Sequence, residues 1–264
     1  MKPETAITLD DGNTCLNRMM LGLVCIAIAG FALVSLSGLV KIQDLPLITH
    51  VHAVVMSVWL ILIAVQSHLG DSGNIALHKS LGKLGALLAI LVVVTGLMLN
   101  FYLLGSGRLP PIFSPGYFLM LGIANLSGFT VFVGAALIMR KNIAWHRRLM
   151  LGALIMIFEP VLGRILPFFV IPILGGGPEN ALSLLMENRE MLEIIRLVTH
   201  LSIVTAMMLG DRFATGRFHP VYAYIFAGVM CLHAVVDGVG GLSIVSDVAN
   251  SLAGTEALMT ATTN

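Results

Sequence analysis

Long apolar runs, separated by short polar connections, follow one another along the chain from Arg18 almost to its end. A helix needs roughly 20 residues to cross a hydrocarbon core about 30 Å thick, and a spanning segment must satisfy its own backbone hydrogen bonds. The pattern therefore predicts an all-α, polytopic membrane helix bundle with seven transmembrane helices. Their predicted bounds are residues 18–41, 46–69, 81–104, 115–139, 149–174, 190–210 and 220–244.

The composition agrees with this fold and limits the number of domains. Hydrophobic residues make up 57% of the chain and charged residues only 11%, which is outside the usual mix of a soluble domain. No connection is long enough to hold a second domain, so residues 18–244 are expected to form one bundle. Residues 1–17 then form an N-terminal tail, and the small, polar residues 245–264 are expected to form a disordered C-terminal tail.

Basic residues gather on every second connection, which predicts the orientation of the bundle. One side receives Lys2, Arg18, Lys79, Lys83, Arg140, Lys141, Arg147, Arg148, Arg212 and Arg217. The other side receives Lys41, Arg108 and Arg189. The positive-inside rule places the N-terminus in the cytoplasm and the C-terminus outside, in a cell membrane that we expect to be a bacterial inner membrane. A net charge of +1 and the lack of a basic, aromatic patch argue against nucleic acid as a partner.

Several ionisable residues interrupt the apolar runs at a similar depth. A rise of about 1.5 Å per residue puts them in the middle and the outer half of the bilayer. Ionisable side chains at this depth face protein or water, and they are candidates for function. This polar layer consists of His52, Glu159, Arg164, Arg196, His200, His233 and Asp237.

Helical spacing shows which members of the polar layer share a face. The sets are His52 with Trp59 and Gln66, Arg196 with His200, and His233 with Asp237. A purely structural interpretation also fits these residues. Glu159 would then only neutralise Arg196 or Arg164, and Asp237 would only hold His233.

Two segments of the chain resemble each other. ALHKSLGKLGALLAI (76–90) and AWHRRLMLGALIMI (144–157) each place a histidine after a short connection, followed by basic residues and an apolar helix. His78 and His146 are 68 residues apart, about the length of a helical hairpin. Duplication of a hairpin explains this pattern, but so does the common placement of basic residues and histidine at the inner end of a helix.

One long stretch of the chain resembles an uncharacterised family of bacterial multi-pass membrane proteins. Its features there are a histidine that opens a helix, a tryptophan and a glutamine within it, and an H-[KR]-x-L-G turn into the next helix. Here these are His52, Trp59, Gln66 and HKSLG from His78. The later segments WHRRLM, EPVLGR and GDRFATGRFHP are also similar, so the resemblance spans residues 50–220. It implies no activity.

The chain also bears a distant likeness to transmembrane di-haem cytochromes b, in which histidines pair across facing helices to ligate haem. The likeness implies haem ligation by histidines on four helices, with His52 and His200 outward and His78 and His146 inward. This chain departs from that family in having seven predicted helices rather than six.

From the histidine placement we predict a haem-b-type redox protein, with a quinone or a redox protein as partner. His52 and His200 are the predicted axial ligands of the iron, and Arg196 and Arg164 are expected near the propionates. The apolar helices also imply that the protein contacts the lipid bilayer.

Two other functions are compatible with the same residues. In the first, Glu159, Arg196, His200 and Asp237 bind a small polar solute or protons for transport. In the second, a metal-dependent membrane hydrolase uses His52, His200, His233 and Asp237 as metal ligands. Hydrolases of the progestin-receptor and ceramidase type have a similar seven-helix outline, but their last helix carries H-x-x-x-H near the cytoplasm, whereas this chain has HAVVD toward the outside. A structural subunit of a larger complex also fits.

Overall fold

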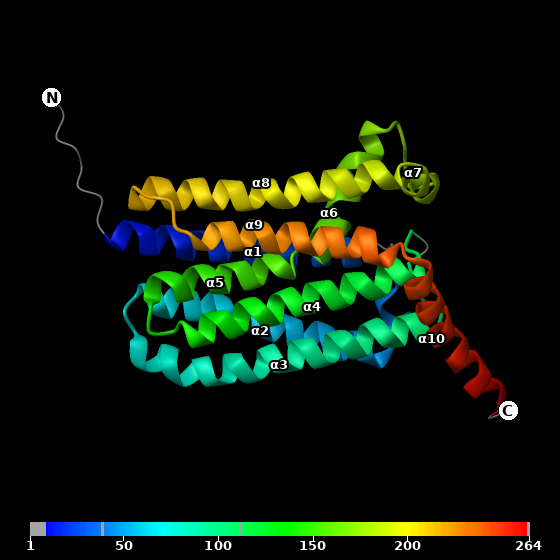
Figure 1. Ribbon diagram of the computed structural model, residues 1–264, viewed down its shortest axis with the longest axis horizontal. Coiled ribbons are helices and arrows are strands. Elements are labelled where there is room, and N and C mark those ends of the chain that lie inside the picture. The colour runs from blue at the N-terminus through cyan, green and yellow to red at the C-terminus, as the bar shows by residue number, and fades with distance from the viewer. Residues whose placement is uncertain (1–8, 38–39, 111, 263–264) are drawn as a thin grey trace.

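The fold is an all-α bundle of long helices that run nearly parallel or antiparallel to one another (Figure 1). The structure, a computed structural model, describes residues 9–37, 40–110 and 112–262. Six helices in this part are long and apolar enough to cross a membrane, and a bent helix pair brings the number to as many as seven. The predicted all-α, multi-pass architecture is therefore confirmed.

The long helices follow the predicted order. They are α1 (Leu9–Leu36), α2 (Leu47–Asp71), α3 (Ile75–Gly105), α4 (Pro115–Ile138), the bent pair α5 (Ile143–Met156) and α6 (Glu159–Ile173), α8 (Arg189–Thr215) and α9 (Val221–Ala234). Shorter elements are the 3-10 turn η1 (Ile42–Asp44), helix α7 (Ala181–Glu187) and a π-helix, η2 (Val235–Val239), that continues α9. Helix α10 (Ser243–Thr262) ends the described chain.

Several helix ends differ from the predicted bounds because of local capping. Helix α3 begins six residues before the predicted position, since the side chain of Asn74 accepts a hydrogen bond from Leu77 N and caps the helix there. The predicted span 149–174 is interrupted after Met156. The predicted span 220–244 changes from an α-helix to a π-helix at Val235.

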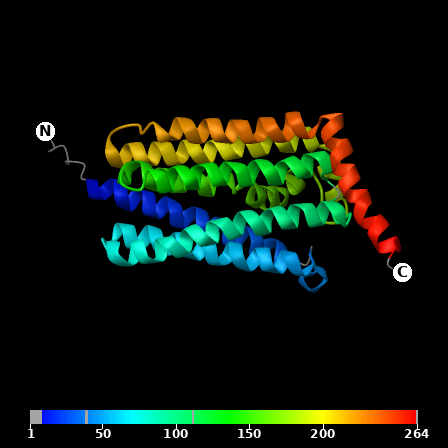
Figure 2. The same cartoon turned by 60° about the horizontal axis from the view of Figure 1, so that its bottom comes forward.

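The C-terminal segment, expected from its composition to be disordered, is helical as α10. Figure 2 shows α10 leaving the end of the bundle at a steep angle to the other helices. Its Ala249 is fully buried and packs with Leu104 of α3 and Leu119 of α4. Burial of this small side chain gives the segment a fixed place against the bundle, which its polar composition did not indicate.

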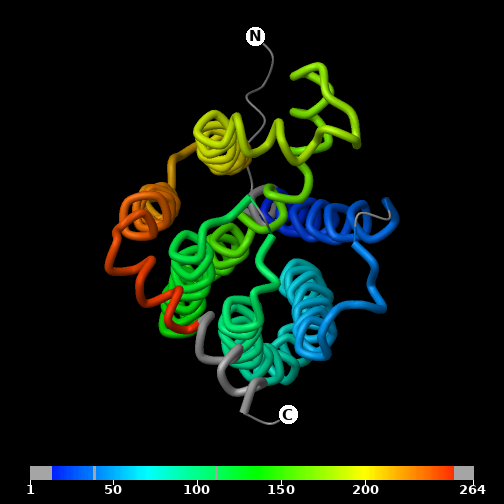
Figure 3. Tube along the Cα trace, turned by 90° about the vertical axis from the view of Figure 1, so that its right-hand side faces the viewer, coloured from blue at the N-terminus to red at the C-terminus, as the bar shows by residue number. Residues whose placement is uncertain are grey.

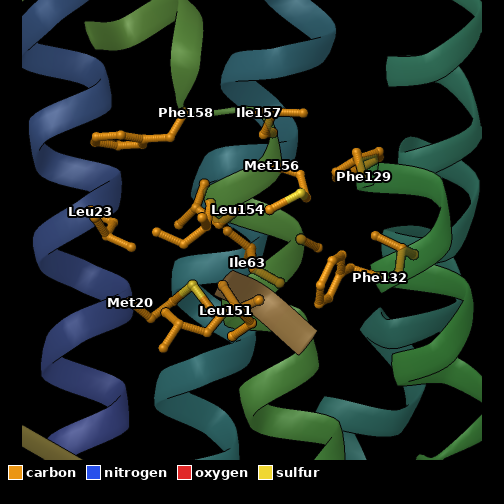
Figure 4. Close-up of a cluster of buried hydrophobic side chains, with 14 of the residues drawn as sticks. Met20, Leu23, Ile63, Phe129, Phe132, Leu151, Leu154, Met156, Ile157 and Phe158 are labelled. Carbon is orange, nitrogen blue, oxygen red and sulfur yellow. The ribbon is translucent and has the colours of Figure 1, made fainter. Parts of the chain in front are cut away.

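Helix α5 lies at the centre of the bundle. Seen end-on, the other long helices surround it (Figure 3). Its residues from Leu151 to Met156 are all buried, and they pack among Met20, Leu23 and Phe132 in the main hydrophobic core (Figure 4). A helix that is apolar on all faces needs neighbours on all faces, and this explains its central place.

The two ends of the bundle also agree with the predicted sorting of charges. The start of α1 and the α2–α3, α4–α5 and α8–α9 connections lie at one end, and α10 lies at the other (Figure 1). The bases of the predicted cytoplasmic connections therefore share one end of the molecule. We call it the basic end.

We expect the basic end to face the cytoplasm, because basic connections are retained on that side of a membrane. A reporter inserted at Asn142 should then report the cytoplasm, and a reporter fused after Asn264 should report the exterior. Alkaline phosphatase and green fluorescent protein fusions, which are active on opposite sides, provide the measurement. Both positions on the same side would refute the seven-span arrangement.

Candidate functional site

The central span is interrupted in the middle of the bundle. Helices α5 and α6 meet at Ile157 and Phe158 with an angle of 55° between them. Pro160 explains the interruption, because it lacks the N–H that would continue the helical ladder and its ring excludes a straight helix. Phe158 N donates to Ile155 O over 3.0 Å, so the chain closes a tight turn here. Carbonyl groups at the end of α5 are thus partly released from the helix.

His200 of α8 occupies this interruption. Its side chain is fully buried, and its Nε2 lies 3.0 Å from Ile155 O. A carbonyl oxygen only accepts, so Nε2 carries the proton and donates it. His200 Nδ1 then accepts from His233 Nε2 of α9, at 3.4 Å. The two histidines connect α5, α8 and α9 at the level where the central span is broken.

A buried ion pair lies beside the same interruption. Glu159, the first residue of α6, is 2% exposed, and its Oε1 lies 2.9 Å from Nη1 of Arg196. A carboxylate is favoured at this position because it lies at the positive end of the α6 dipole. Arg196 also donates to the hydroxyl of buried Tyr117 on α4. This contact confirms the prediction that Glu159 pairs with an arginine.

Arg164 belongs to a different contact. Its Nη1 donates to Pro160 O over 2.8 Å, and its guanidinium lies 4.3 Å from the centre of the Phe31 ring on α1. The first contact joins residues four apart in the first turns of α6, and the second is a cation–π interaction. Arg164 therefore stabilises the start of α6 against α1, and Arg196 is the partner of Glu159.

A small pocket of about 60 Å³ opens beside the ion pair toward the end of the bundle opposite the basic end. Arg196, Tyr117 and Arg189 contribute polar groups to its lining. The other lining residues are Ile112, Phe113, Gly163, Leu166, Pro167, Leu185, Leu192 and Glu193. Arg189 is held by Glu193 at 2.9 Å and lies 4.9 Å from the centre of the Tyr117 ring. Within the described chain, Nε of Arg196 is buried without a hydrogen-bond partner.

Asp237 lies in the π-helix one turn beyond His233. Its side chain is exposed, in contrast to buried His233. Short π-helical segments cost hydrogen-bond geometry and are frequent at functional sites. The sequence predicted His233 and Asp237 as members of the polar layer, but it did not predict the change from an α-helix to a π-helix between them.

His52 and His200, the predicted axial ligands, each have a hydrogen-bond partner of their own. His52, on α2, has its Nδ1 2.9 Å from Oγ1 of Thr95 on α3. Helix α2 packs against α1 and α3, whereas α8 packs against α1, α6 and α9. His52 and His200 therefore have different hydrogen-bond partners, and their ligation of a haem iron stays a prediction.

The ligands predicted for a metal hydrolase, His52, His200, His233 and Asp237, do not form one cluster in the described part of the chain. In residues 9–37, 40–110 and 112–262 no cluster of three or more histidine, cysteine, aspartate or glutamate side chains has metal-binding geometry. His200 and His233 do meet, but each uses a ring nitrogen in the hydrogen bond between them.

The structure does bring His78 and His146 together at the basic end. Their ring centres are 6.2 Å apart and the ring planes are perpendicular. The likeness to di-haem cytochromes b implied that these two histidines lie inward on different helices. That prediction gave no indication of their partners, which are backbone carbonyls of the preceding helices.

One buried ion pair escaped the sequence analysis. Arg148 of α5 donates through Nε and Nη2 to the two carboxylate oxygens of Asp211 on α8, each over 2.7 Å. The sequence analysis placed Arg148 among the bases of the cytoplasmic side and did not select Asp211. Their opposite charge at the same depth on two helices was the signal that could have paired them.

Comparisons with models of known protein families, with curated proteins and with solved structures find no match to this chain.

Replacing Arg196 with leucine should destabilise the protein more than replacing both Arg196 and Glu159 with leucine. The single change leaves a buried, uncompensated carboxylate, at a cost of about 3–5 kcal/mol, whereas the double change removes both charges. The midpoint of thermal unfolding in detergent is the measurement, with the exposed Arg108→Leu as control. A double variant no more stable than Arg196→Leu would contradict the pairing.

Proposed function

We propose that this membrane protein binds a small polar solute with a carboxylate group beside the α5–α6 interruption and carries it across the membrane. The observation that carries the proposal is the interruption itself, at which Glu159 and Arg196 form a buried ion pair. Irregular backbone at membrane depth is tolerated where it is buried in protein or lines a cavity. Interrupted helices with free backbone groups are a common way of building solute sites in transporters.

The residues near the pocket favour an anionic group on the solute. Nε of Arg196 is a buried donor without a hydrogen-bond partner, although Nη1 of the same guanidinium pairs with Glu159. Arg189, which is held by Glu193, brings a second guanidinium to the same pocket. Guanidinium groups bind carboxylates through paired, charge-assisted hydrogen bonds. The Tyr117 hydroxyl, already in contact with Arg196, adds a neutral polar group. The small volume favours a solute of a few non-hydrogen atoms.

The histidines near the interruption support a change of conformation rather than direct binding. His200 satisfies the carbonyl of Ile155 from α8, and His233 supports His200 from α9. At a helix break, donor side chains can form hydrogen bonds with the exposed backbone carbonyls. The angle between the two helices can then change without leaving a carbonyl unsatisfied in lipid. A fixed α-helix has no such freedom, so the break is where we place movement during transport.

The proposal predicts uptake of small carboxylates by proteoliposomes that contain the purified protein. Radiolabelled acetate, lactate, succinate and glutamate are the probes, and at least one should enter faster than into protein-free liposomes. The double variant Arg196→Leu, Glu159→Leu removes the binding charge without leaving a lone buried ion. It should lose at least tenfold in uptake rate, because a charge-assisted hydrogen bond to a buried group contributes about 1.5–3 kcal/mol.

Arg108→Leu is the matched control for this assay, because Arg108 is an exposed arginine near the same end of the bundle and outside the pocket. It should transport at the wild-type rate. Absence of uptake for all four probes would contradict the proposal, as would full activity of the double variant in protein shown by circular dichroism to be folded.

A further inference from the structure

Two helical hairpins of the bundle share a local motif at the basic end. In the hairpin α2–α3, Asn74 caps α3 by accepting from Leu77 N, and His78 follows four residues after the cap. In the hairpin α4–α5, Asn142 caps α5 by accepting from Trp145 N, and again a histidine follows four residues later. The sequence similarity around these histidines thus corresponds to a repeated structure, N-x-x-x-H at a helix start.

Each of the two histidines is oriented by the preceding helix of its hairpin. His78 Nδ1 lies 3.2 Å from the backbone oxygen of Gln66, and His146 Nδ1 lies 2.8 Å from the backbone oxygen of Ala136. Carbonyl oxygens only accept, so Nδ1 is the protonated nitrogen of both rings. In a neutral imidazole the other nitrogen, Nε2, then carries a lone pair. Within the described chain no hydrogen bond to either Nε2 is formed.

This orientation is typical of histidines that bind metals. Metal-binding histidines almost always donate their second N–H to a carboxylate or a backbone carbonyl, which fixes the tautomer and the ring direction. Here the same arrangement occurs twice, once in each hairpin, and the two rings meet.

The ring separation fits two imidazoles on opposite sides of one ion. Metal–nitrogen bonds of about 2.0–2.1 Å, with about 1.1 Å from each nitrogen to its ring centre, put the two centres about 6.3 Å apart in a linear arrangement. The observed separation of the His78 and His146 ring centres is 6.2 Å.

Gln66 provides an independent observation beside the histidines. Its side chain is 7% exposed, and neither its amide oxygen nor its amide nitrogen has a hydrogen-bond partner among the described residues. The amide nitrogen lies 3.9 Å from the position that a Cβ on Gly82 would occupy, one turn of α3 beyond His78. A buried amide without a partner is costly. Its carbonyl oxygen can bind an ion, or a water molecule on that ion.

We propose that His78 and His146 bind one late first-row transition-metal ion through their Nε2 atoms, at the basic end of the bundle and between the two hairpins. Neutral imidazoles are suitable ligands for zinc, copper, iron and nickel, and among divalent ions copper binds most strongly. The Gln66 side chain supplies the oxygen next to this ion. The site is separate from the polar pocket at the opposite end, so its test does not depend on solute transport.

The test uses Cu²⁺ added to the full-length, tag-free protein in detergent, because an affinity tag would itself bind copper. We expect one Cu²⁺ per chain, with pulsed EPR showing two bound imidazoles. His78→Ala or His146→Ala should weaken binding at least tenfold, since even partners outside the coordination sphere change metal affinity by about 10–100-fold. The control His68→Ala removes an exposed histidine at the same end and should bind Cu²⁺ like the wild type.

Pulsed EPR of the wild-type protein tests the proposal even if both alanine variants fail to fold, because it counts the imidazoles bound to Cu²⁺. One bound imidazole, or none, would overturn it, and so would site variants that are folded and bind Cu²⁺ as tightly as the control. The visible spectrum of protein from haem-supplied cells adds a further outcome. A Soret band that disappears in His78→Ala or His146→Ala would overturn the bare-ion site and assign the pair to haem.

Discussion

A broken backbone in the middle of a membrane bundle must be completed by other groups, and this constraint determines much of the structure. Helix α5 cannot run straight into α6, because Pro160 lacks the N–H that would continue the ladder, and lipid offers no hydrogen bond in its place. His200 supplies a second donor to Ile155 O, which also accepts from Phe158 N, and Arg164 donates to Pro160 O within the first turn of α6. The surrounding helices are therefore fixed by polar contacts at their centre, in addition to apolar packing.

The same constraint explains why polar residues of distant parts of the sequence lie at one level. A donor from α8 is useful at the break only if its side chain reaches α5, and His233 is useful only if α9 lies next to α8. The ion pair of Glu159 and Arg196 then neutralises charge at the same depth. A π-helix begins two residues beyond His233, so two helices of the bundle are irregular in the same region.

Local periodicity was sufficient to predict the helices, and it was insufficient to predict which of them are neighbours. Apolar runs define spans because the thickness of the bilayer fixes their length. The depth of His52 and His200 could be estimated from the sequence, but their hydrogen-bond partners could not, because these depend on how α2 and α8 pack. His52 contacts Thr95, a residue whose apolar surroundings gave no reason to select it. Glu159 could be assigned an arginine because an isolated buried carboxylate is unfavourable, and the choice between Arg196 and Arg164 required the structure.

The two buried ion pairs between the central span and α8 have opposite polarity. At the basic end the central span contributes the cation, Arg148, and α8 the anion, Asp211. Nearer the other end the central span contributes the anion, Glu159, and α8 the cation, Arg196. On α8 the two charges are separated by 15 residues, or roughly 22 Å of helix. A slide of α8 along the central span would break both pairs at once, so together they fix the register of α8 against α5 and α6.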